Sequence, residues 1–203
     1  MPLSDENLVL RFQAGDQDAF EELFLRYRDK AYALALRMLR HPDMAADVVQ
    51  ETFLRLCKGL RRFRGEASFS TYLYRVVSNL CMDEIRRRQR GQQVSMSVSG
   101  EEGGRQREIA GGLSDPEEEL VRKEYARRVE EALGRLPEDY RLAVVLRDVH
   151  GLSYEEMAAV MQCPLGTVKS RLSRARGMLR DILTEMELLP PGHVKTGEGR
   201  ETR

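Results

Sequence analysis

The chain has 203 residues, 41% of them hydrophobic, and its 33 basic side chains balance its 33 acidic ones, so a general polycation is excluded and any nucleic-acid surface is local. The three cysteines and three histidines lack disulfide or metal-ligand spacing, which predicts no metal, no cofactor and a reducing compartment. Without a signal sequence or a hydrophobic run of ~20 residues, we expect a soluble cytoplasmic protein with no membrane insertion.

Residues 1–90 are predicted to form one helical domain. Ser4 can cap a short first helix, and Asp16 can cap a long helix over residues 17–39 that is hydrophobic along one side. Pro42 then interrupts the helical pattern, because a residue before proline is pushed out of the helical region.

A third helix, expected over residues 44–60, combines a buried stripe with a charged outer face. The stripe consists of Val49, Phe53, Leu56 and Leu60. Leu54 lies alone among charges on the outer face, a pattern that fits an interface anchor with a polar rim as well as an ordinary exposed leucine. The residues of this outer face are Asp47, Glu51, Leu54, Arg55 and Lys58.

Aromatic and arginine residues are interleaved in the loop over residues 61–71, which has Gly65 at its centre, and in the helix expected over residues 72–88. Rings that can stack on bases beside positive charges are what a single strand of nucleic acid requires. Rings also pack in cores, as we expect in part for Phe63 and Tyr74. The helix buries Leu73, Val77 and Leu80 and turns outward Arg75, Ser78, Asn79, Met82 and Arg86.

Residues 91–115 contain six glycines and four serines, a composition typical of a flexible linker. A second domain over residues 116–183 starts with Pro116 at a helix N-terminus, and its first helices are expected over residues 116–134 and 137–149. The Pro, Gly and polar residues of 184–203 predict a disordered tail. The fold class is therefore all-α, with two small helical domains joined by a linker.

The second domain contains the features of a helix-turn-helix over residues 151–179. Ser153 and Glu156 form a capping box at the start of one helix, and Pro164 suits the first position of the next. The second helix has five basic residues and no acid over residues 165–180. A basic helix alone is usually only solvated, but a capped helix, a short corner and a basic second helix together place side chains in the major groove of DNA.

One side of this second helix is expected to be buried, and the opposite side is expected to contact DNA. Its buried stripe consists of Val168, Leu172, Ala175 and Leu179. The residues on the opposite side, predicted to read a DNA duplex, are Lys169, Ser170, Ser173 and Arg174. Arg171 and Arg176 flank that side and are expected to hold phosphates.

The sequence resembles the extracytoplasmic-function (ECF) sigma factors, the small two-domain members of the bacterial housekeeping sigma family. Five blocks in family order carry the resemblance over nearly the whole chain: AGDQDAFEELFLRY, DVVQETFLRL, FRGEASFSTYLYRVVSN, LPEDYRLAVVLRDVHGLSYEEMAAVM and CPLGTVKSRLSRAR. The resemblance implies that the first domain docks on the clamp of the largest subunit of core RNA polymerase and opens the minus-10 promoter element. The second domain would read the minus-35 element as a duplex, and an anti-sigma factor would be a further partner.

On this basis the outer face of the third helix is expected to dock on the polymerase, and the loop with its following helix to capture an extruded non-template base. Asn79 would read the base edge, Phe69 or Tyr72 would stack on it, and two arginines would track the strand. The minus-10 residues are Phe63, Gly65, Phe69, Tyr72, Arg75, Asn79 and Arg86. Two residues depart from the family: Tyr72 stands where tryptophan is common, and Ser173 is small where some members have a larger side chain.

We therefore predict a sigma factor that leaves the chemistry to the polymerase and has no catalytic residue. The alternative is a stand-alone helix-turn-helix regulator with a sensing or dimerising first domain, in which the strand-binding loop and the Leu54 face would have no task. A nucleic-acid enzyme would need a carboxylate cluster, metal spacing or activated nucleophile, and the sequence offers none of these.

Overall fold

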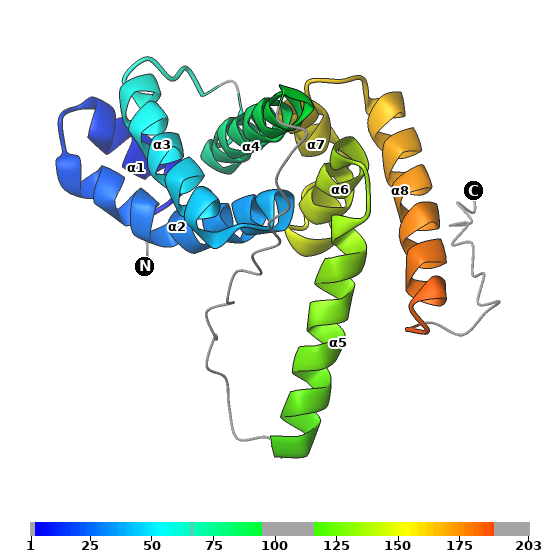
Figure 1. The fold of residues 1–203 in the computed structure, drawn as a ribbon. Coiled ribbons are helices and arrows are strands. Elements are labelled where there is room, and N and C mark those ends of the chain that lie inside the picture. The colour runs from blue at the N-terminus through cyan, green and yellow to red at the C-terminus, as the bar shows by residue number, and fades with distance from the viewer. Residues whose placement is uncertain (1–2, 66, 95–115, 189–203) are drawn as a thin grey trace, which may run out of the picture.

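The computed structural model describes residues 3–65, 67–94 and 116–188, and every regular element within these ranges is helical, which confirms the all-α prediction. The first group comprises α1 (Asp5–Gln13), α2 (Gln17–Leu39), α3 (Pro42–Leu60) and α4 (Phe69–Val94). The second group comprises α5 (Pro116–Gly134), α6 (Glu138–Val144), the π-helical turn η1 (Val145–Val149), α7 (Tyr154–Met161) and α8 (Leu165–Glu185). The two groups lie against each other, chiefly through α4 and α7 (Figure 1).

The caps predicted for the first two helices are confirmed. Ser4 Oγ accepts a hydrogen bond from the backbone N–H of Asn7 at 3.3 Å, and Asp16 Oδ1 accepts one from that of Asp18 at 3.1 Å. Each cap satisfies a backbone donor that has no partner within its helix.

The helix-turn-helix is formed by α7 and α8. The predicted capping box is present: Ser153 N–H donates to Glu156 Oε2 at 2.8 Å, and Glu156 N–H donates to Ser153 Oγ at 3.1 Å. Gln162 ends α7 in the left-handed conformation with φ of 51°. Pro164 precedes the first residue of α8, one position outside the helix rather than inside it.

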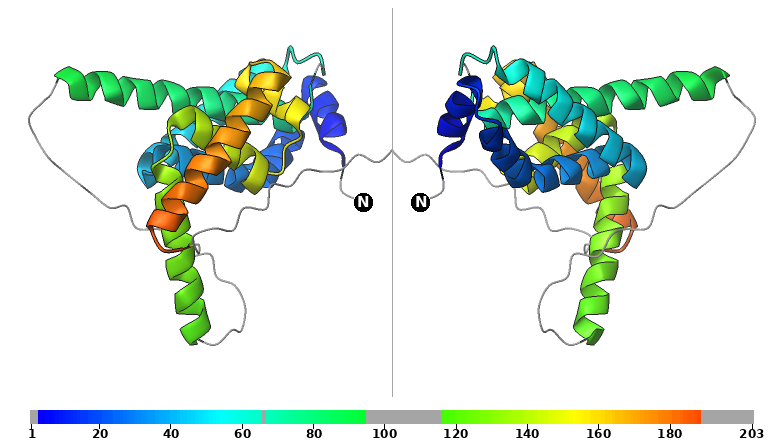
Figure 2. Two further views of the ribbon diagram at one scale, coloured as in Figure 1. Left: turned by 90° about the vertical axis from the view of Figure 1, so that its right-hand side faces the viewer. Right: turned by 90° about the vertical axis from the view of Figure 1, so that its left-hand side faces the viewer.

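The structure corrects two predicted boundaries. The fourth helix begins at Phe69 rather than residue 72 and continues to Val94, so residues 91–94 are helical although they were assigned to the linker. Similarly, α8 includes residues 184–185 of the predicted tail. The arginines and glutamines at the end of α4 are good helix formers, and Figure 2 shows that this end projects from the other helices. The linker prediction for residues 95–115 and the tail prediction for 189–203 lie outside the described residues.

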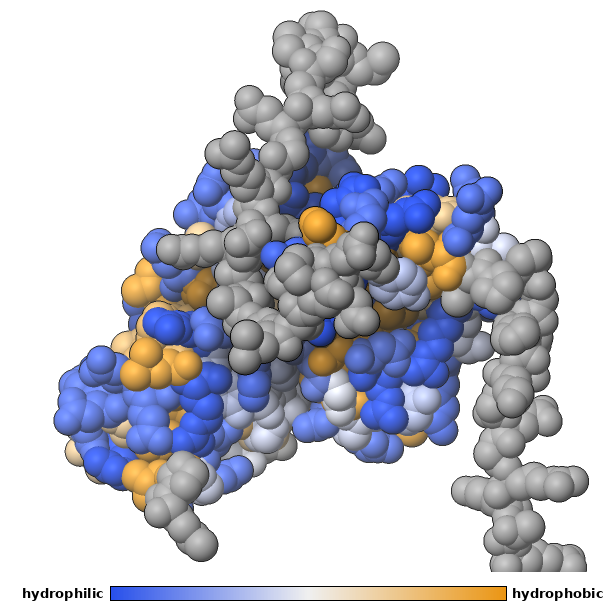
Figure 3. Space-filling model, turned by 90° about the horizontal axis from the view of Figure 1, so that it is seen from below, coloured by the Kyte–Doolittle hydropathy of each residue, from blue (hydrophilic) through white to orange (hydrophobic). Residues whose placement is uncertain are grey.

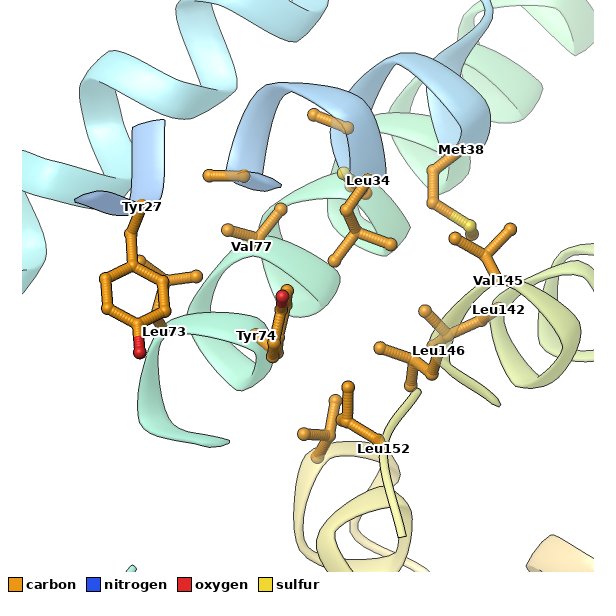
Figure 4. Packing of buried hydrophobic residues seen from close by; sticks show 14 of the residues in the cluster. Tyr27, Leu34, Met38, Leu73, Tyr74, Val77, Leu142, Val145, Leu146 and Leu152 are labelled. Carbon is orange, nitrogen blue, oxygen red and sulfur yellow. The ribbon is translucent and has the colours of Figure 1, made fainter. Parts of the chain in front are cut away.

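The two groups share one hydrophobic core, although the sequence indicated separate domains. In the close view of Figure 4, side chains from α2 and α4 face side chains from α6, η1 and the start of α7. Their burial removes hydrophobic surface from water at roughly 25 cal/mol per Å² and so favours the packed arrangement. The labelled residues at this boundary are Leu34, Met38, Tyr74, Val77, Leu142, Val145, Leu146 and Leu152.

Arg141 connects the two groups across the same boundary through hydrogen bonds. It is 8% exposed, and its guanidinium donates to four backbone carbonyls. Two of these carbonyls, Leu133 O and Gly134 O, lie at the end of α5, and a third, Leu136 O, lies in the turn that follows it. The fourth is Met38 O at 2.7 Å, near the end of α2. Cations are favoured at helix C-termini, where the carbonyls lack helical partners.

His150 also makes a contact between the two groups, and the turn η1 positions it. The backbone N–H of His150 donates to Val145 O at 3.1 Å, five residues back, and Gly151 then adopts a φ of +72°. The imidazole contacts Tyr74 of α4, with 3.2 Å between His150 Nδ1 and Tyr74 Oη and 5.0 Å between the ring centroids. A half-buried histidine of the second group therefore packs against a buried tyrosine of the first.

Candidate nucleic-acid interface

The outer face of α8 is exposed as its helical spacing predicts. Val168, Leu172 and Ala175 are buried in the core. The four residues expected to read the duplex are all exposed: Lys169, Ser170, Ser173 and Arg174. The side chains therefore form a row along the surface of the second helix of a helix-turn-helix, which is the part that enters a major groove.

Two basic residues of α8 are already paired with acids of the preceding helices. Arg171 Nη2 lies 3.1 Å from Asp139 Oδ2, and Arg176 Nε lies 3.2 Å from Asp148 Oδ2. The hydrogen bond with Asp148 raises the pKa of Arg176. Partly exposed pairs of this kind contribute little to stability, so a phosphate can replace the acid as partner.

These acidic partners could not be predicted from the sequence, because ion pairs between separate helices leave no periodic signal.

The other two basic residues on this face of α8 have no acidic partner in the described part of the chain. Arg174 makes no hydrogen bond or ion pair with the described part of the chain, and Lys169 Nζ lies 5.8 Å from the centre of the Tyr154 ring. Arg174 is thus the arginine of this helix that is free for a base edge.

The predicted strand-binding loop carries a stack of aromatic rings. The Phe63 and Tyr72 rings are 5.2 Å apart with an interplanar angle of 24°, and the Arg75 guanidinium lies 5.4 Å from the Tyr72 ring. Gly65 is exposed with a φ of +72°, a conformation that favours glycine. The loop and the start of α4 therefore present two stacked rings beside a positive charge, the combination that a single strand of nucleic acid requires.

The structure does not place Phe69 where it could stack on a base. Its side chain is 2% exposed, and its ring packs edge-on against Tyr27 at 5.1 Å between centroids. Because α4 begins at Phe69, its first turn directs this ring toward α2. Of the two rings expected to stack on the captured base, only Tyr72 remains partly exposed.

The outward face of α4 is also narrower than expected. Ser78 is 2% exposed, and Cys81 rather than Leu80 is buried, so the buried stripe runs through Leu73, Val77 and Cys81. The sequence pattern assumed one neighbouring layer, whereas α4 packs against α2 and α3 on one side and α7 on the other. Asn79 and Arg86 remain exposed as predicted.

Residues from several predicted surfaces line one cleft of about 420 Å³ between the two helical groups. Asn79 and Arg86 belong to the predicted minus-10 face of α4, and Arg171 of α8 is predicted to hold a phosphate. In this arrangement residues from the two predicted nucleic-acid surfaces therefore line a common space. Lining residues include Arg55, Asn79, Arg86, Asp139, Gln162 and Arg171.

The predicted docking face lies on α3, where Leu54 is 58% exposed. Around it, Asp47, Arg55 and Lys58 are exposed, and Glu51 Oε1 lies 2.6 Å from Arg55 Nε. On the face drawn in Figure 3, hydrophobic residues lie in small separate groups among hydrophilic ones. An isolated exposed leucine with a charged rim matches the centre and border of a small interface.

Within the described residues, no group of three or more His, Cys, Asp or Glu side chains is arranged to hold a metal ion. Among the same residues, no helix is long and apolar enough to cross a membrane.

Comparison with known proteins identifies two family regions in the chain. Residues 23–91 match the family model of sigma-70 region 2, and residues 126–179 match that of sigma-70 region 4. The ECF RNA polymerase sigma-E factor of Escherichia coli K12 is 41% identical over 179 residues, covering 86% of this chain and 91% of the relative. RNA polymerase sigma-H factor of Pseudomonas aeruginosa is 38% identical over 173 residues, covering 85% and 90% respectively.

Two solved structures are also similar to this chain. The sigma factor RpoE from Bartonella quintana, in complex with the anti-sigma factor NepR, matches with a TM-score of 0.66 and 28% identity, covering 81% of this chain and 96% of the other. CnrH, in complex with the cytosolic domain of CnrY, matches with a TM-score of 0.64 and 28% identity, covering 89% and 97%.

These matches define a transcription initiation factor built from sigma regions 2 and 4. The chain belongs to the sigma-70 family of RNA polymerase sigma factors, in its ECF group. It gives core RNA polymerase its promoter specificity and is not an enzyme. The stand-alone regulator considered from the sequence is thereby set aside.

Proposed function

We propose that α8 reads the minus-35 promoter element through Lys169, Ser170, Ser173 and Arg174. The observation that carries this assignment is the exposed row that these residues form opposite the buried stripe of the helix. Arg171 and Arg176 exchange their aspartate partners for DNA phosphates, which holds the helix in register. Within this scheme residues 1–90 are the polymerase-binding and minus-10 domain, and 116–183 the minus-35 domain.

Arg174→Ala and Arg176→Ala form a matched pair that tests this division of roles. Loss of a base-reading arginine is expected to cost about 1 to 3 kcal/mol on the cognate minus-35 element and to relax one position. Loss of the phosphate contact at Arg176 is expected to weaken matched and scrambled sites alike and to lower the salt slope by about 1. The measurement is holoenzyme binding to a minus-35 library at several salt concentrations. Equal losses on all sites for Arg174→Ala would remove its reading role.

At the minus-10 element we assign base capture to the loop after α3 together with Asn79. A base cannot be read along its pairing edge inside the duplex, so it must be extruded at a cost of a few kcal/mol. The exposed amide of Asn79 offers donors and an acceptor, and the Phe63–Tyr72 stack offers a ring surface. Stacking contributes about 1 to 3 kcal/mol per base, which can offset the unpairing.

Asn79→Ala holoenzyme is expected to open promoters poorly both on a normal duplex and on a template already mismatched through the minus-10 element. Because the amide reads the base directly, its loss is also expected to change the preferred base on the mismatched template. The measurement is affinity for mismatched templates that carry each of the four bases. An unchanged base preference would make Asn79 a structural residue.

Core polymerase is proposed to dock on the outer face of α3 around Leu54, through the clamp of its largest subunit. The exposed leucine and its charged rim support this assignment. The same partner places the protein in the cytoplasm. An anti-sigma factor is proposed as a further partner, because the RpoE relative was solved with one.

Promoter binding also requires the two helical groups to separate. The minus-35 and minus-10 elements are about 25 base pairs apart, which is about 85 Å of duplex at roughly 3.4 Å per base pair. Asn79 and Arg171, one from each proposed DNA surface, instead line a single cleft. The packed arrangement is therefore the state before promoter binding.

A further inference from the structure

One side chain of α1 reaches the loop that follows α3. Gln13 is the last residue of α1, and its Nε2 donates to Leu60 O and to Phe63 O, both at 2.8 Å. These partners lie 47 and 50 residues further along the chain. Leu60 is the last residue of α3, so a single amide group connects the end of one helix to the end of another and to the loop entrance.

The bonds satisfy acceptors at the end of α3. The last carbonyls of a helix have no helical partner, and here the chain turns sharply, with Phe63 N–H donating to Leu60 O at 3.1 Å. Gln13 is held in place by the turn that follows it, in which Gly15 has a φ of +104° and Asp16 caps α2. A capping role alone would require the bond to Leu60 O but not the bond to Phe63 O.

The second bond matters because Phe63 belongs to the aromatic stack. Its ring lies on Tyr72, and Tyr72 packs closely over the last turn of α3. A Cβ atom at Gly59 would be 2.3 Å from Tyr72 Oη and 3.4 Å from the nearest ring carbon, so a larger residue there would push the tyrosine hydroxyl, and the ring with it, out of this position. Gln13 thus fixes the backbone of the residue that covers Tyr72, and Gly59 clears the position of Tyr72 itself.

We infer that Gln13 is a positioning residue for base capture: it fixes Phe63, and with it the start of the loop, before the promoter strand arrives. Its role in capture rests on the function proposed above for this loop, whereas its role in holding the loop does not. Ordering a loop in advance lowers the cost of binding, because the freedom is lost on folding rather than on DNA binding.

The chain contains no tryptophan, so Tyr72→Trp creates a single fluorescent reporter within the stack. In this background Gln13→Glu keeps the size of the side chain but replaces the donating amide with a carboxylate that faces two carbonyl oxygens. The matched control is Gln17→Glu, an exposed glutamine at the start of α2 that makes no hydrogen bond or ion pair within the described chain. Circular dichroism and affinity for core polymerase check that each variant is folded.

Gln13→Glu is expected to lower the fluorescence anisotropy of the reporter in the free protein and to weaken holoenzyme binding to a template mismatched through minus 10 by about five- to tenfold. Binding of the minus-35 duplex is expected to stay unchanged. Gln17→Glu is expected to match the parent in both measurements. Gly59→Ala, made in the Tyr72 background, is expected to give a loss on the mismatched template by displacing the tyrosine ring.

An unchanged reporter signal in Gln13→Glu would overturn the positioning role. So would a changed signal with full affinity for the mismatched template, provided that Asn79→Ala lowers that affinity. If Asn79→Ala and Gln13→Glu both leave the affinity unchanged, base capture by this loop fails, and the inference fails with it. The two failures are therefore distinguished by the Asn79 variant.

Discussion

Replacing Leu54 by aspartate is expected to lower the affinity for core RNA polymerase about 30-fold or more, which corresponds to about 2 kcal/mol. Leu54 is the exposed hydrophobic centre of the docking face proposed on α3, and an aspartate there would place an unpaired charge in the contact. The measurement is a binding titration with fluorescently labelled sigma factor and purified core polymerase.

The control for this prediction is Leu25→Asp. Leu25 is a similarly exposed leucine, 53% against 58% for Leu54, but it lies on α2. It is expected to leave the affinity unchanged, so a general effect of surface charge would be detected. If Leu54→Asp binds as tightly as the parent and is equally helical, the docking face lies elsewhere on the protein.

Acidification is expected to separate the two helical groups, because His150 lies half-buried between them as a neutral ring. Burial, followed by the positive charges of Arg37 and Lys30, lowers the pKa of His150 from 6.5 to about 4. Its Nε2 is buried without a partner in the described chain. Among the residues that the structure describes, no carboxylate is in hydrogen-bond contact with the imidazole to stabilise its charged form.

The titratable and charged groups next to His150 do not account for a change in packing at low pH. Arg37 Nε lies 2.9 Å from Glu130 Oε1, so its charge is already shared with an acid. Burial and the nearby Glu156 raise the pKa of Tyr74, so its hydroxyl stays protonated in the acidic range. Protonation of His150 is thus the change expected at this boundary as the pH falls below neutrality.

The direction of the pH effect follows from the pKa of His150 in the packed state and in the separated state. In the separated state His150 is exposed to water and regains a pKa near 6.5, so the packed state is fully favoured above that pH and loses its advantage as the pH falls toward 4. The total loss is about 3 kcal/mol, since each pKa unit corresponds to about 1.4 kcal/mol. At pH 5 the packing equilibrium is expected to weaken about 30-fold.

Small-angle X-ray scattering across pH 7 to 4.5 measures this separation as a rise in radius of gyration, and circular dichroism tests whether the helices persist. His150→Gln, which cannot titrate, is expected to stay compact through the window. His41→Gln is the matched control, because His41 lies at the start of α3 within the first group and its removal should leave the transition in place. A transition that is the same in wild type and His150→Gln would contradict the prediction.

Much of the local structure could be predicted from the sequence. Ser4, Asp16 and the Ser153–Glu156 pair identified helix starts because their short polar side chains satisfy backbone donors within the next turn. Three of the four residues predicted for the buried stripe of α8 are buried and Leu179 is partly buried, because helical spacing alone determines which residues share a face. These signals come from residues within a few positions of one another.

Contacts between distant elements could not be predicted in the same way. Phe69 was assigned to the nucleic-acid surface because it flanks a glycine loop, but contact with Tyr27, far away in the chain, buries it. Ser78 was expected to face water because α4 was treated as having one neighbouring layer. The packing of the second group on the first leaves no pattern in either segment, so neither the shared cleft nor the role of His150 followed from the sequence.

The bonding of Arg141 keeps the polar cost of separating the two groups low. When the groups part, the guanidinium loses only its bond to Met38 O and keeps three carbonyl partners within its own group. Water can take the vacated site on the guanidinium and on Met38 O, so neither a charge nor a carbonyl is stranded in a dry interior. Arg141 therefore adds little polar cost to separation, and the main cost is exposure of the hydrophobic side chains that the two groups share.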